Sequence, residues 1–418
     1  MIKMKKNNPV NQSILDLFSE ETISGVAYKN KALKRAIINH LDKMEQSTIT
    51  DLTQAMNISV PKTTSLVNEL INDGLVRDSG KIGSKGGRRA SLYSLVAESA
   101  FFIGVDVKHY HVNIGLLDFR KNMVMEEMHV PYLLANTQES LDQLIQIIQD
   151  FISKLPAATS NILALCLNLS GRVNSESGYS YSYFHFQEEP LSATLEKITG
   201  IRTYLENDSR AMAYGEFHRG IVSSEKNVLY VNLDYGIGLG IMIDGKIYRG
   251  KSGFAGEFGH IPLFTNELIC HCGKKGCLET EASGQALVRL FKEKIKQGSG
   301  STLLTHHQLP VPLLLSDIIQ ATHKEDVLCI ELLADIGEKI GRGLSVLINI
   351  FNPELVILGG MLAETGEYIR LPVRSALNKY SLNLVNNDTQ LLMSRLTEKA
   401  GVTGGCLIAR DKLLSVQP

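Results

Sequence analysis

The sequence predicts a multidomain fold, in which a small N-terminal domain of helices and a β-hairpin precedes a duplicated α/β body. Three observations support this prediction. The chain has 418 residues, too many for one ordinary domain of roughly 100–200 residues. Residues 30–97 show helical periodicity followed by a glycine-rich, basic hairpin. From residue 98 onward, strands and helices are mixed in two similar rounds, which is typical of α/β folds.

The composition excludes several classes of protein. Hydrophobic residues make up 44% of the chain and charged residues 21%, a globular balance that excludes wholesale disorder and collagen-like structure. No apolar run reaches the ~18 residues that a membrane span needs. The basic start of the chain leads into no apolar segment of the secretory type. Six cysteines are too few for a disulfide scaffold. We therefore expect a cytoplasmic protein with no membrane partner.

The net charge of −1 hides an uneven distribution of charge. Residues 1–97 hold 14 Lys and Arg against 9 Asp and Glu, a net charge of +5, so the remainder carries −6. Such an asymmetry suggests an anionic partner for the basic end of the chain. The excess is modest, and it needs a motif to support it.

The order of elements over residues 30–74 is that of a helix-turn-helix. Apolar residues at helical spacing predict a first helix from residue 30, and Thr50 can cap a short second helix. Ser59 is the predicted N-cap of a third helix, and Gly74 suits its C-terminal end. The outer face of this third helix carries small or hydrogen-bonding side chains, namely Lys62, Thr64, Ser65, Asn68 and Asn72.

That outer face suits a helix that enters the major groove of DNA, although the solvated face of an ordinary three-helix bundle is an alternative. The next segment favours DNA. Residues 75–77 and 90–95 predict two antiparallel strands, and residues 78–89 between them form a glycine-rich, basic wing. Arginines on such a wing can enter a minor groove, where negative potential is concentrated. The predicted DNA contacts are Lys62, Thr64, Ser65, Asn68, Lys85, Arg88 and Arg89.

Residues 30–97 are therefore predicted to form a winged helix-turn-helix that binds a double-stranded DNA operator, after an N-terminal extension at residues 1–29. One such module covers only half of a two-fold site, so useful specificity normally needs a dimer. We expect a homodimer or a homotetramer.

The body is predicted to contain two α/β lobes, at residues 98–220 and 221–418. Each lobe begins with successive strands, at residues 101–107, 111–118 and 123–130, then 227–234 and 236–247. Ligands of such folds tend to bind at strand ends, in the cleft between the lobes.

Three of the six cysteines lie within eight positions, at Cys270, Cys272 and Cys277. His260, ten residues upstream, completes a set of one imidazole and three thiolates. Zn²⁺ favours this set in closed, structural sites without an open water position. His271 is the rival fourth ligand, but its place between two ligating cysteines is worse for turning inward.

Four segments together resemble the ROK family of repressors, open reading frames and sugar kinases. They are Gly-Glu-x-Gly-His at 256–260, Cys-x-Cys-Gly-x-x-Gly-Cys-x-Glu at 270–279, Glu-Asn-Asp at 206–208 and Gly-Gly at 359–360. The N-terminal winged helix, with its Gly-Gly-Arg-Arg tip, resembles the NagC/XylR-type repressor branch. The resemblance implies an actin-like, sugar-kinase-like body that holds a structural zinc ion.

The resemblance also implies a pocket for a sugar or a sugar phosphate. Matched position by position, the residues that would hold the sugar hydroxyls are Gly171, Asn207, Asp208, Glu257, His260 and Glu279, with Arg172 a weaker candidate. Carboxylates accept hydrogen bonds from hydroxyls, and asparagine offers both a donor and an acceptor. The histidine would bind zinc through one ring nitrogen and a hydroxyl through the other.

In the kinases of the family, Asp208 would be the general base. Phosphoryl transfer also needs backbone-rich cradles for the phosphates. In place of Asp-x-Gly-x-Thr, this chain has Asp-Val-Lys-His-Tyr at 106–110, and in place of Gly-Thr-Gly-x-Gly it has Asp-Tyr-Gly-Ile-Gly at 234–238. Bulky or acidic side chains replace the first glycines and threonines of the cradles. We therefore expect the chain to bind a sugar without being an enzyme.

The sequence thus predicts a sugar-responsive transcriptional regulator of carbohydrate metabolism genes that acts as a repressor. The alternative is an ATP-dependent ROK kinase of hexoses or N-acetylhexosamines that carries an accessory DNA-binding domain. A third hypothesis is a zinc-stapled scaffold that binds neither sugar nor DNA.

Overall fold

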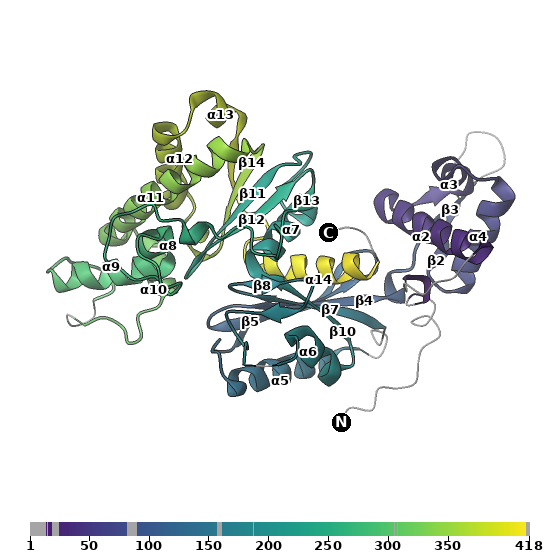
Figure 1. The fold of residues 1–418 in the computed structure, drawn as a ribbon, viewed down its shortest axis with the longest axis horizontal. Coiled ribbons are helices and arrows are strands. Elements are labelled where there is room, and N and C mark those ends of the chain that lie inside the picture. Colours follow the sequence, from purple (N-terminus) through teal and green to yellow (C-terminus); the bar gives the residue numbers. More distant parts are fainter. Residues whose placement is uncertain are drawn as a thin grey trace.

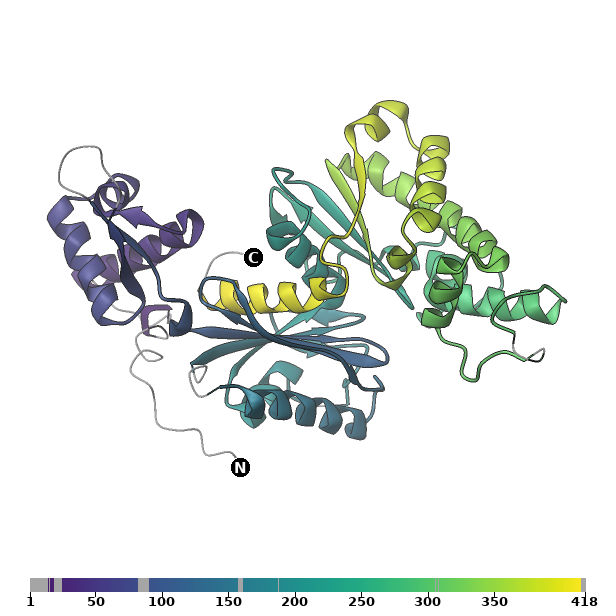
Figure 2. The same ribbon diagram turned by 180° about the vertical axis from the view of Figure 1, so that it is seen from behind.

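A computed structural model describes residues 14, 16–18, 25–81, 90–156, 161–186, 188–304, 306 and 308–414. Figures 1 and 2 show an N-terminal domain and a second α/β lobe on opposite sides of a first α/β lobe. None of the helices in these ranges is long and apolar enough to cross a membrane. The wing residues Lys85, Arg88 and Arg89 lie outside the described ranges.

The N-terminal domain contains the three predicted helices, α2 (Val26–Met44), α3 (Ile49–Met56) and α4 (Val60–Asn72). The second helix is capped by Thr48 and not by Thr50, the predicted cap. The Thr48 hydroxyl accepts a hydrogen bond from the Asp51 amide, and the Asp51 carboxylate accepts one from the Thr48 amide. This reciprocal capping box satisfies two free amides at the helix start, so it determines where the helix begins.

Three short strands complete the N-terminal domain. They form an antiparallel sheet in the order β1-β3-β2, from β1 (Ser47–Thr48), β2 (Val76–Lys81) and β3 (Ser91–Leu95). The paired strand β2 continues to Lys81, so residues 78–81 are strand and not loop as predicted. Three helices followed by paired strands agree with the order predicted for a winged helix-turn-helix.

The first lobe is built on a five-stranded sheet in the order β10-β7-β4-β5-β6. Its strands are β4 (Phe101–Val107), β5 (His111–Asp118), β6 (Met123–Pro131), β7 (Ile162–Leu169) and β10 (Arg202–Asn207). The helices α5 (Gln138–Lys154) and α6 (Leu191–Thr199) cover one face, and α7 (Asp208–Arg219) and α14 (Lys399–Leu413) cover the other (Figure 1). A small hairpin of β8 (Val173–Asn174) and β9 (Tyr179–Ser180) lies beside β10.

The second lobe repeats this plan with a sheet in the order β13-β12-β11-β14-β15. Its strands are β11 (Val228–Leu233), β12 (Ile237–Ile243), β13 (Lys246–Ile247), β14 (Leu355–Gly359) and β15 (Gln390–Met393). Its helices are α8 (Leu278–Ala282), α9 (Gly284–Lys296), α10 (Leu315–His323), α11 (Val327–Phe351), α12 (Glu367–Tyr380) and α13 (Asn383–Asp388). In both lobes the first strand pairs antiparallel with the second strand and parallel with a later one, as a duplication predicts.

The C-terminal helix α14 returns to the first lobe, where it packs on β4, β5, β7 and α7. The prediction that residues 221–418 form the second lobe therefore needs correction for this helix. The reason is burial: residues 400–411 are buried all round the helix, so α14 needs neighbours on both sides. The first sheet and α7 provide them.

The contact between α14 and α7 is so close that only glycine fits. A Cβ added to Gly404 would lie 1.7 Å from the carbonyl oxygen of Ala211 in α7. Gly404→Ala should therefore lower the free energy of unfolding by about 1–3 kcal/mol, because overpacking displaces neighbouring atoms. Urea denaturation followed by circular dichroism measures the loss. Gly300→Ala is the control, since a Cβ there meets nothing within 4 Å, and equal losses in the two variants would contradict the prediction.

Candidate functional site

A cavity of about 1050 Å³ lies between the two lobes. Its size is at the upper end of the range for small-molecule sites. Its wall contains every predicted sugar-binding residue, namely Gly171, Asn207, Asp208, Glu257, His260 and Glu279, and also Arg172. The tertiary structure therefore brings together residues that are spread over more than a hundred positions of the sequence.

Two of these residues form the start of α7. The Asn207 side chain caps the helix, with Oδ1 accepting from the Arg210 amide at 3.1 Å, while Nδ2 donates to the Gly171 carbonyl at 3.0 Å. Asp208 is nearly buried, and its Oδ1 accepts from the Ser209 amide at 2.7 Å. The hydrogen bonds that the described residues give to this carboxylate all end on Oδ1. Oδ2 is thus the atom available to a ligand.

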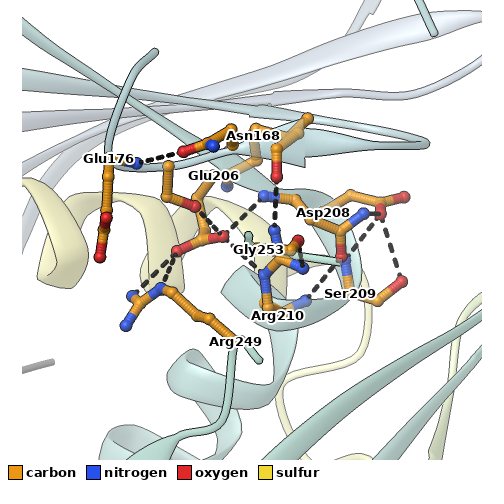
Figure 3. A network of polar contacts seen from close by, with 12 residues as sticks. Asn168, Glu176, Glu206, Asp208, Ser209, Arg210, Arg249 and Gly253 are labelled. Atoms are coloured by element: carbon orange, nitrogen blue, oxygen red, sulfur yellow. Dashed lines mark hydrogen bonds and ion pairs between the residues drawn. The ribbon is translucent and has the colours of Figure 1, made fainter. Parts of the chain in front are cut away.

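A buried charge network holds this helix start in place, with Glu206 at its centre (Figure 3). Glu206 Oε1 accepts from Arg210 Nε at 2.7 Å, and Oε2 pairs with Arg249 Nη2 at 2.9 Å. Arg210 donates onward to the carbonyl oxygens of Gly253 at 2.8 Å and Val173 at 3.2 Å. The network therefore joins the start of α7 to β8 in the first lobe and to residues 249–253 in the second.

Burial alone would raise the pKa of Glu206, but the Arg210 and Arg249 guanidinium groups hold it well below its usual range. Glu206 is fully buried, so its carboxylate depends on these two cations for its charge. Glu206 belongs to the Glu-Asn-Asp motif at 206–208, but its place in this network was not predicted from the sequence. The available signal was the spacing of four residues between Glu206, near the end of β10, and Arg210, in the first turn of α7.

The predicted metal-binding loop, with His260 and residues 270–277, carries a closed set of four donors. The ligand atoms of His260, Cys270, Cys272 and Cys277 all lie within 4.8 Å of one another. The Sγ atoms of Cys272 and Cys277 are 3.6 Å apart, and Cys270 Sγ is 3.5 Å from His260 Nδ1. These side chains therefore fit a four-coordinate metal ion.

The rival ligand His271 is directed elsewhere. A second group of possible donors contains His260, Cys270, His271 and Glu279. However, His271 Nδ1 pairs with Glu279 Oε1 at 3.1 Å, and its side chain is 69% exposed. The three-cysteine set is the better closed of the two.

The metal-binding loop also positions part of the cavity wall. His260 turns Nδ1 toward the cysteines, while its Nε2 lies 3.7 Å from Glu257 Oε2, a predicted sugar-binding group. Cys277 precedes α8, and Glu279 lies on that helix, where Oε2 accepts from the Ile237 amide at 3.1 Å. A metal ion in this loop would hold both His260 and Glu279.

Three aromatic side chains lie in the two segments where the sequence predicts altered phosphate cradles. His109 and Tyr110 follow β4 in the first lobe, and Tyr235 follows β11 in the second. The ring centroids are 4.4 Å apart for His109 and Tyr110, and 5.2 Å apart for Tyr110 and Tyr235. All three rings line the cavity, so they meet across the cleft.

An ion pair lies beside these rings, between Lys108 Nζ and Asp106 Oδ2 at 3.2 Å. Burial raises the pKa of Asp106 to about 6, although Lys108 opposes this effect. Burial alone would lower the pKa of Lys108, but Asp106, Asp234 and Asp208 together raise it. The lysine therefore stays protonated and is held by acids.

The predicted DNA contacts on α4 share one face. Thr63, Leu66, Val67 and Leu70 are buried, while Lys62, Thr64, Ser65 and Asn68 remain wholly or partly exposed. Two of the exposed hydroxyls bond within their own helix, since Thr64 donates to the Val60 carbonyl at 2.9 Å and Ser65 to Glu69 Oε1 at 3.3 Å. Lys62 and Asn68 are thus the better placed contacts on this face.

The Glu206 network gives a stability prediction. Glu206→Gln should lower the free energy of unfolding by about 3–5 kcal/mol, because it leaves buried arginines without their counter-ion. Since folding lowers the pKa of Glu206, its contribution is fully present above the unfolded value of about 4.3 and is lost as pH falls. Urea denaturation at several pH values measures both effects.

The matched control is Glu367→Gln, which removes an exposed ion pair with Arg370. Its expected cost is about 0–1 kcal/mol. Similar losses in the two variants would contradict the role assigned to Glu206.

Comparison with known proteins places these features in one family. Residues 102–412 match the model of the ROK family. The chain is 28% identical over 407 residues to the xylose repressor of Caldicellulosiruptor bescii, across 97% of this chain and 98% of the relative. It is 29% identical to the DNA-binding transcriptional dual regulator NagC of Escherichia coli, across 92% of this chain and 93% of that protein.

Solved structures of ROK family proteins have the same fold as this chain. A ROK family transcriptional regulator, described as a homolog of the E. coli MLC protein, has a TM-score of 0.76 at 24% identity, across 92% of this chain and 97% of its own. A ROK family glucokinase from Streptomyces griseus, in complex with glucose and AMPPNP, has a TM-score of 0.64 at 26% identity, across 74% of this chain and 99% of its own. The match to the transcriptional regulator covers 92% of this chain and so includes part of the N-terminal domain, whereas the match to the glucokinase covers only 74%. The chain therefore belongs to the ROK family, with the actin-like body that its sequence predicted.

Proposed function

We propose that this chain is a cytoplasmic, sequence-specific transcriptional repressor of carbohydrate metabolism genes, controlled by a sugar that binds in the cleft of a non-catalytic body. One observation carries the proposal. The cavity gathers all the predicted hydroxyl-binding side chains, yet its phosphate-cradle positions are filled by the rings of His109, Tyr110 and Tyr235. Relatives named as repressors align over nearly the whole chain, which supports the same function.

The sugar is bound by groups of complementary chemistry. The carboxylates of Asp208, Glu257 and Glu279 accept hydrogen bonds from hydroxyls, and Asn207 adds a polar side chain at the start of α7. His260 reaches the cavity with the ring nitrogen that faces away from the cysteines. The effector is a free sugar or a sugar phosphate.

The kinase alternative is the weaker one. Asp208 could act as a general base, but phosphoryl transfer depends on positioning a metal-bound nucleotide in phosphate cradles. Here bulky rings and the Asp106–Lys108 pair occupy those positions. The glucokinase covers 74% of this chain, whereas the xylose repressor covers 97%. The additional quarter contains the N-terminal domain, which a kinase reaction does not need.

DNA binding is assigned to the N-terminal domain. The exposed face of α4 lies in the major groove, with Lys62 and Asn68 directed at the duplex, and the basic wing contacts the minor groove or the phosphates. Two domains of a homodimer or homotetramer read the two halves of an operator. Because effector and operator affinities are linked, each changes the other by the same factor.

The metal in the four-donor loop is a structural zinc ion in this proposal. Tetrahedral zinc with its usual bond lengths holds two thiolate sulfurs about 3.8 Å apart, and a sulfur and an imidazole nitrogen about 3.6 Å apart. The corresponding separations of 3.6 Å and 3.5 Å are close to these values. Zinc would fix the loop and orient His260 and Glu279 toward the sugar.

The repressor function predicts that one sugar changes operator affinity. A binding site is first selected from a random DNA library, and its Kd is measured by fluorescence anisotropy with xylose, glucose, N-acetylglucosamine and their phosphates. At least one of these ligands should change the Kd by about 5- to 150-fold, the usual range of allosteric coupling. Asp208→Asn should abolish this response while operator binding without sugar remains.

Two measurements separate the alternatives. Arg88→Ala combined with Arg89→Ala should weaken operator binding and leave sugar binding intact, so an unchanged Kd for DNA would refute the wing assignment. An assay of ADP release with ATP and the same sugars should show no turnover. Sugar-dependent ADP release at ordinary kinase rates would favour the kinase alternative.

The zinc proposal has its own test. Cys272→Ala should lose the metal and weaken sugar binding, because His260 and Glu279 would no longer be held by the loop. Elemental analysis measures zinc per chain, and isothermal titration with the effector measures binding. Cys329→Ala is the matched control, since this buried cysteine lies outside the metal-binding loop. Full zinc content in Cys272→Ala would contradict the ligand set.

A further inference from the structure

We propose that Asp42, near the end of α2, is the residue of the N-terminal domain through which sugar binding is transmitted to the DNA-binding surface. The inference rests on the proposed function, and it names the coupling residues. Both oxygens of the Asp42 carboxylate are bound by cations of the first lobe. Oδ1 lies 2.6 Å from Arg410 Nη2, and Oδ2 lies 2.7 Å from Lys121 Nζ.

The first path to Asp42 runs through α14. Arg410 is 1% exposed and pairs with Asp411 through Nη1 at 2.8 Å. The other oxygen of Asp411 accepts a hydrogen bond from the Tyr214 hydroxyl of α7 at 2.6 Å. A buried polar chain therefore connects α7 to the N-terminal domain in the order Tyr214, Asp411, Arg410, Asp42.

The second path begins at the other end of α7. The Arg219 guanidinium donates to the carbonyl oxygen of Lys121, and the ammonium of the same lysine pairs with Asp42. Both paths thus leave α7 at different positions and meet on one carboxylate. Such convergence makes the position of Asp42 sensitive to a movement of α7 as a whole.

The start of α7 is in the effector cavity, where Asn207 caps the helix and Asp208 lines the wall. Tyr214 is six residues farther along, about 9 Å at the usual helical rise. Residues 208–216 are all buried, and the backbone of α14 touches that of α7 at Gly404. Because side chains cannot absorb a shift at such a contact, α14 must follow α7.

The two ion pairs of Asp42 make the position of α2 depend on the positions of Arg410 and Lys121. Its side chain is only 12% exposed, so the ion pairs lie at the junction of the domains with little access to water. Charge-assisted hydrogen bonds are short and directional. A displacement of α7 by a bound sugar would therefore change the orientation of α2, and with it the spacing of the DNA-binding helices in the oligomer.

The test compares the operator Kd with and without sugar in the full-length protein. The wild-type ratio should be about 5- to 150-fold. In Asp42→Asn, which interrupts both paths, the ratio should fall to below about 2-fold. In Tyr214→Phe, which interrupts only the first path, the ratio should fall below the wild-type value but stay above that of Asp42→Asn. Sugar binding, measured by isothermal titration, should stay within about 3-fold of wild type in both variants. Because both paths meet at Asp42, the double variant should lose no more coupling than Asp42→Asn alone.

Asp335→Asn is the matched control, because it makes the same chemical change in an ion pair with Lys339 on α11 and should keep the wild-type ratio. Wild-type ratios in both test variants would overturn the proposal. Loss of both binding activities in Tyr214→Phe would also overturn it, because the chain of contacts would then be structural only. A wild-type protein whose operator affinity no sugar changes would instead refute the proposed function itself.

Discussion

The burial of α7 between the two lobes is the constraint on which the rest of the structure depends. One side of this helix packs against α14 and the other against β12, where a Cβ on Gly240 would lie 2.6 Å from the Ser209 carbonyl oxygen. Contacts between backbones leave no flexible side chain to absorb displacement. The start of the helix must therefore lie in the cleft, and its far end must lie near the N-terminal domain.

Two separate devices hold the cavity around that helix start. The Glu206 carboxylate and its two arginines join the two lobes, and the four-donor loop carries His260 and leads to Glu279, which both line the cavity. The buried carboxylate and its arginines depend on one another, because a buried charge is costly without its partner. A metal ion held by the four donors would stabilise their loop in a similar way. Polar and charged side chains thus line the cavity near the start of α7, as a pocket for hydroxyl groups would require.

The predictions from sequence succeeded where local chemistry decides the structure. The spacing of Cys270, Cys272 and Cys277, together with the glycine-rich strand ends, identified the family, and the predicted donors do lie within 4.8 Å of one another. They failed at one local choice between two neighbouring threonines, and at one place where a distant helix joins another lobe. Thr48 caps α3 instead of Thr50 because a reciprocal bond with Asp51 is available there, and α14 joins the first lobe because its burial requires two neighbours.

The sequence by itself determined the two-part organisation of the protein and its basic N-terminal quarter, and it predicted four metal ligands and a set of residues for a sugar pocket. These features follow from residue types and from spacings of a few residues, which can be seen in the sequence without knowing the tertiary structure. Only the tertiary structure decided that Glu206 meets Arg249, that His109 and Tyr235 meet across the cleft, and that Asp42 pairs with Arg410. Those contacts join residues up to 368 positions apart, and no local pattern records such a distance.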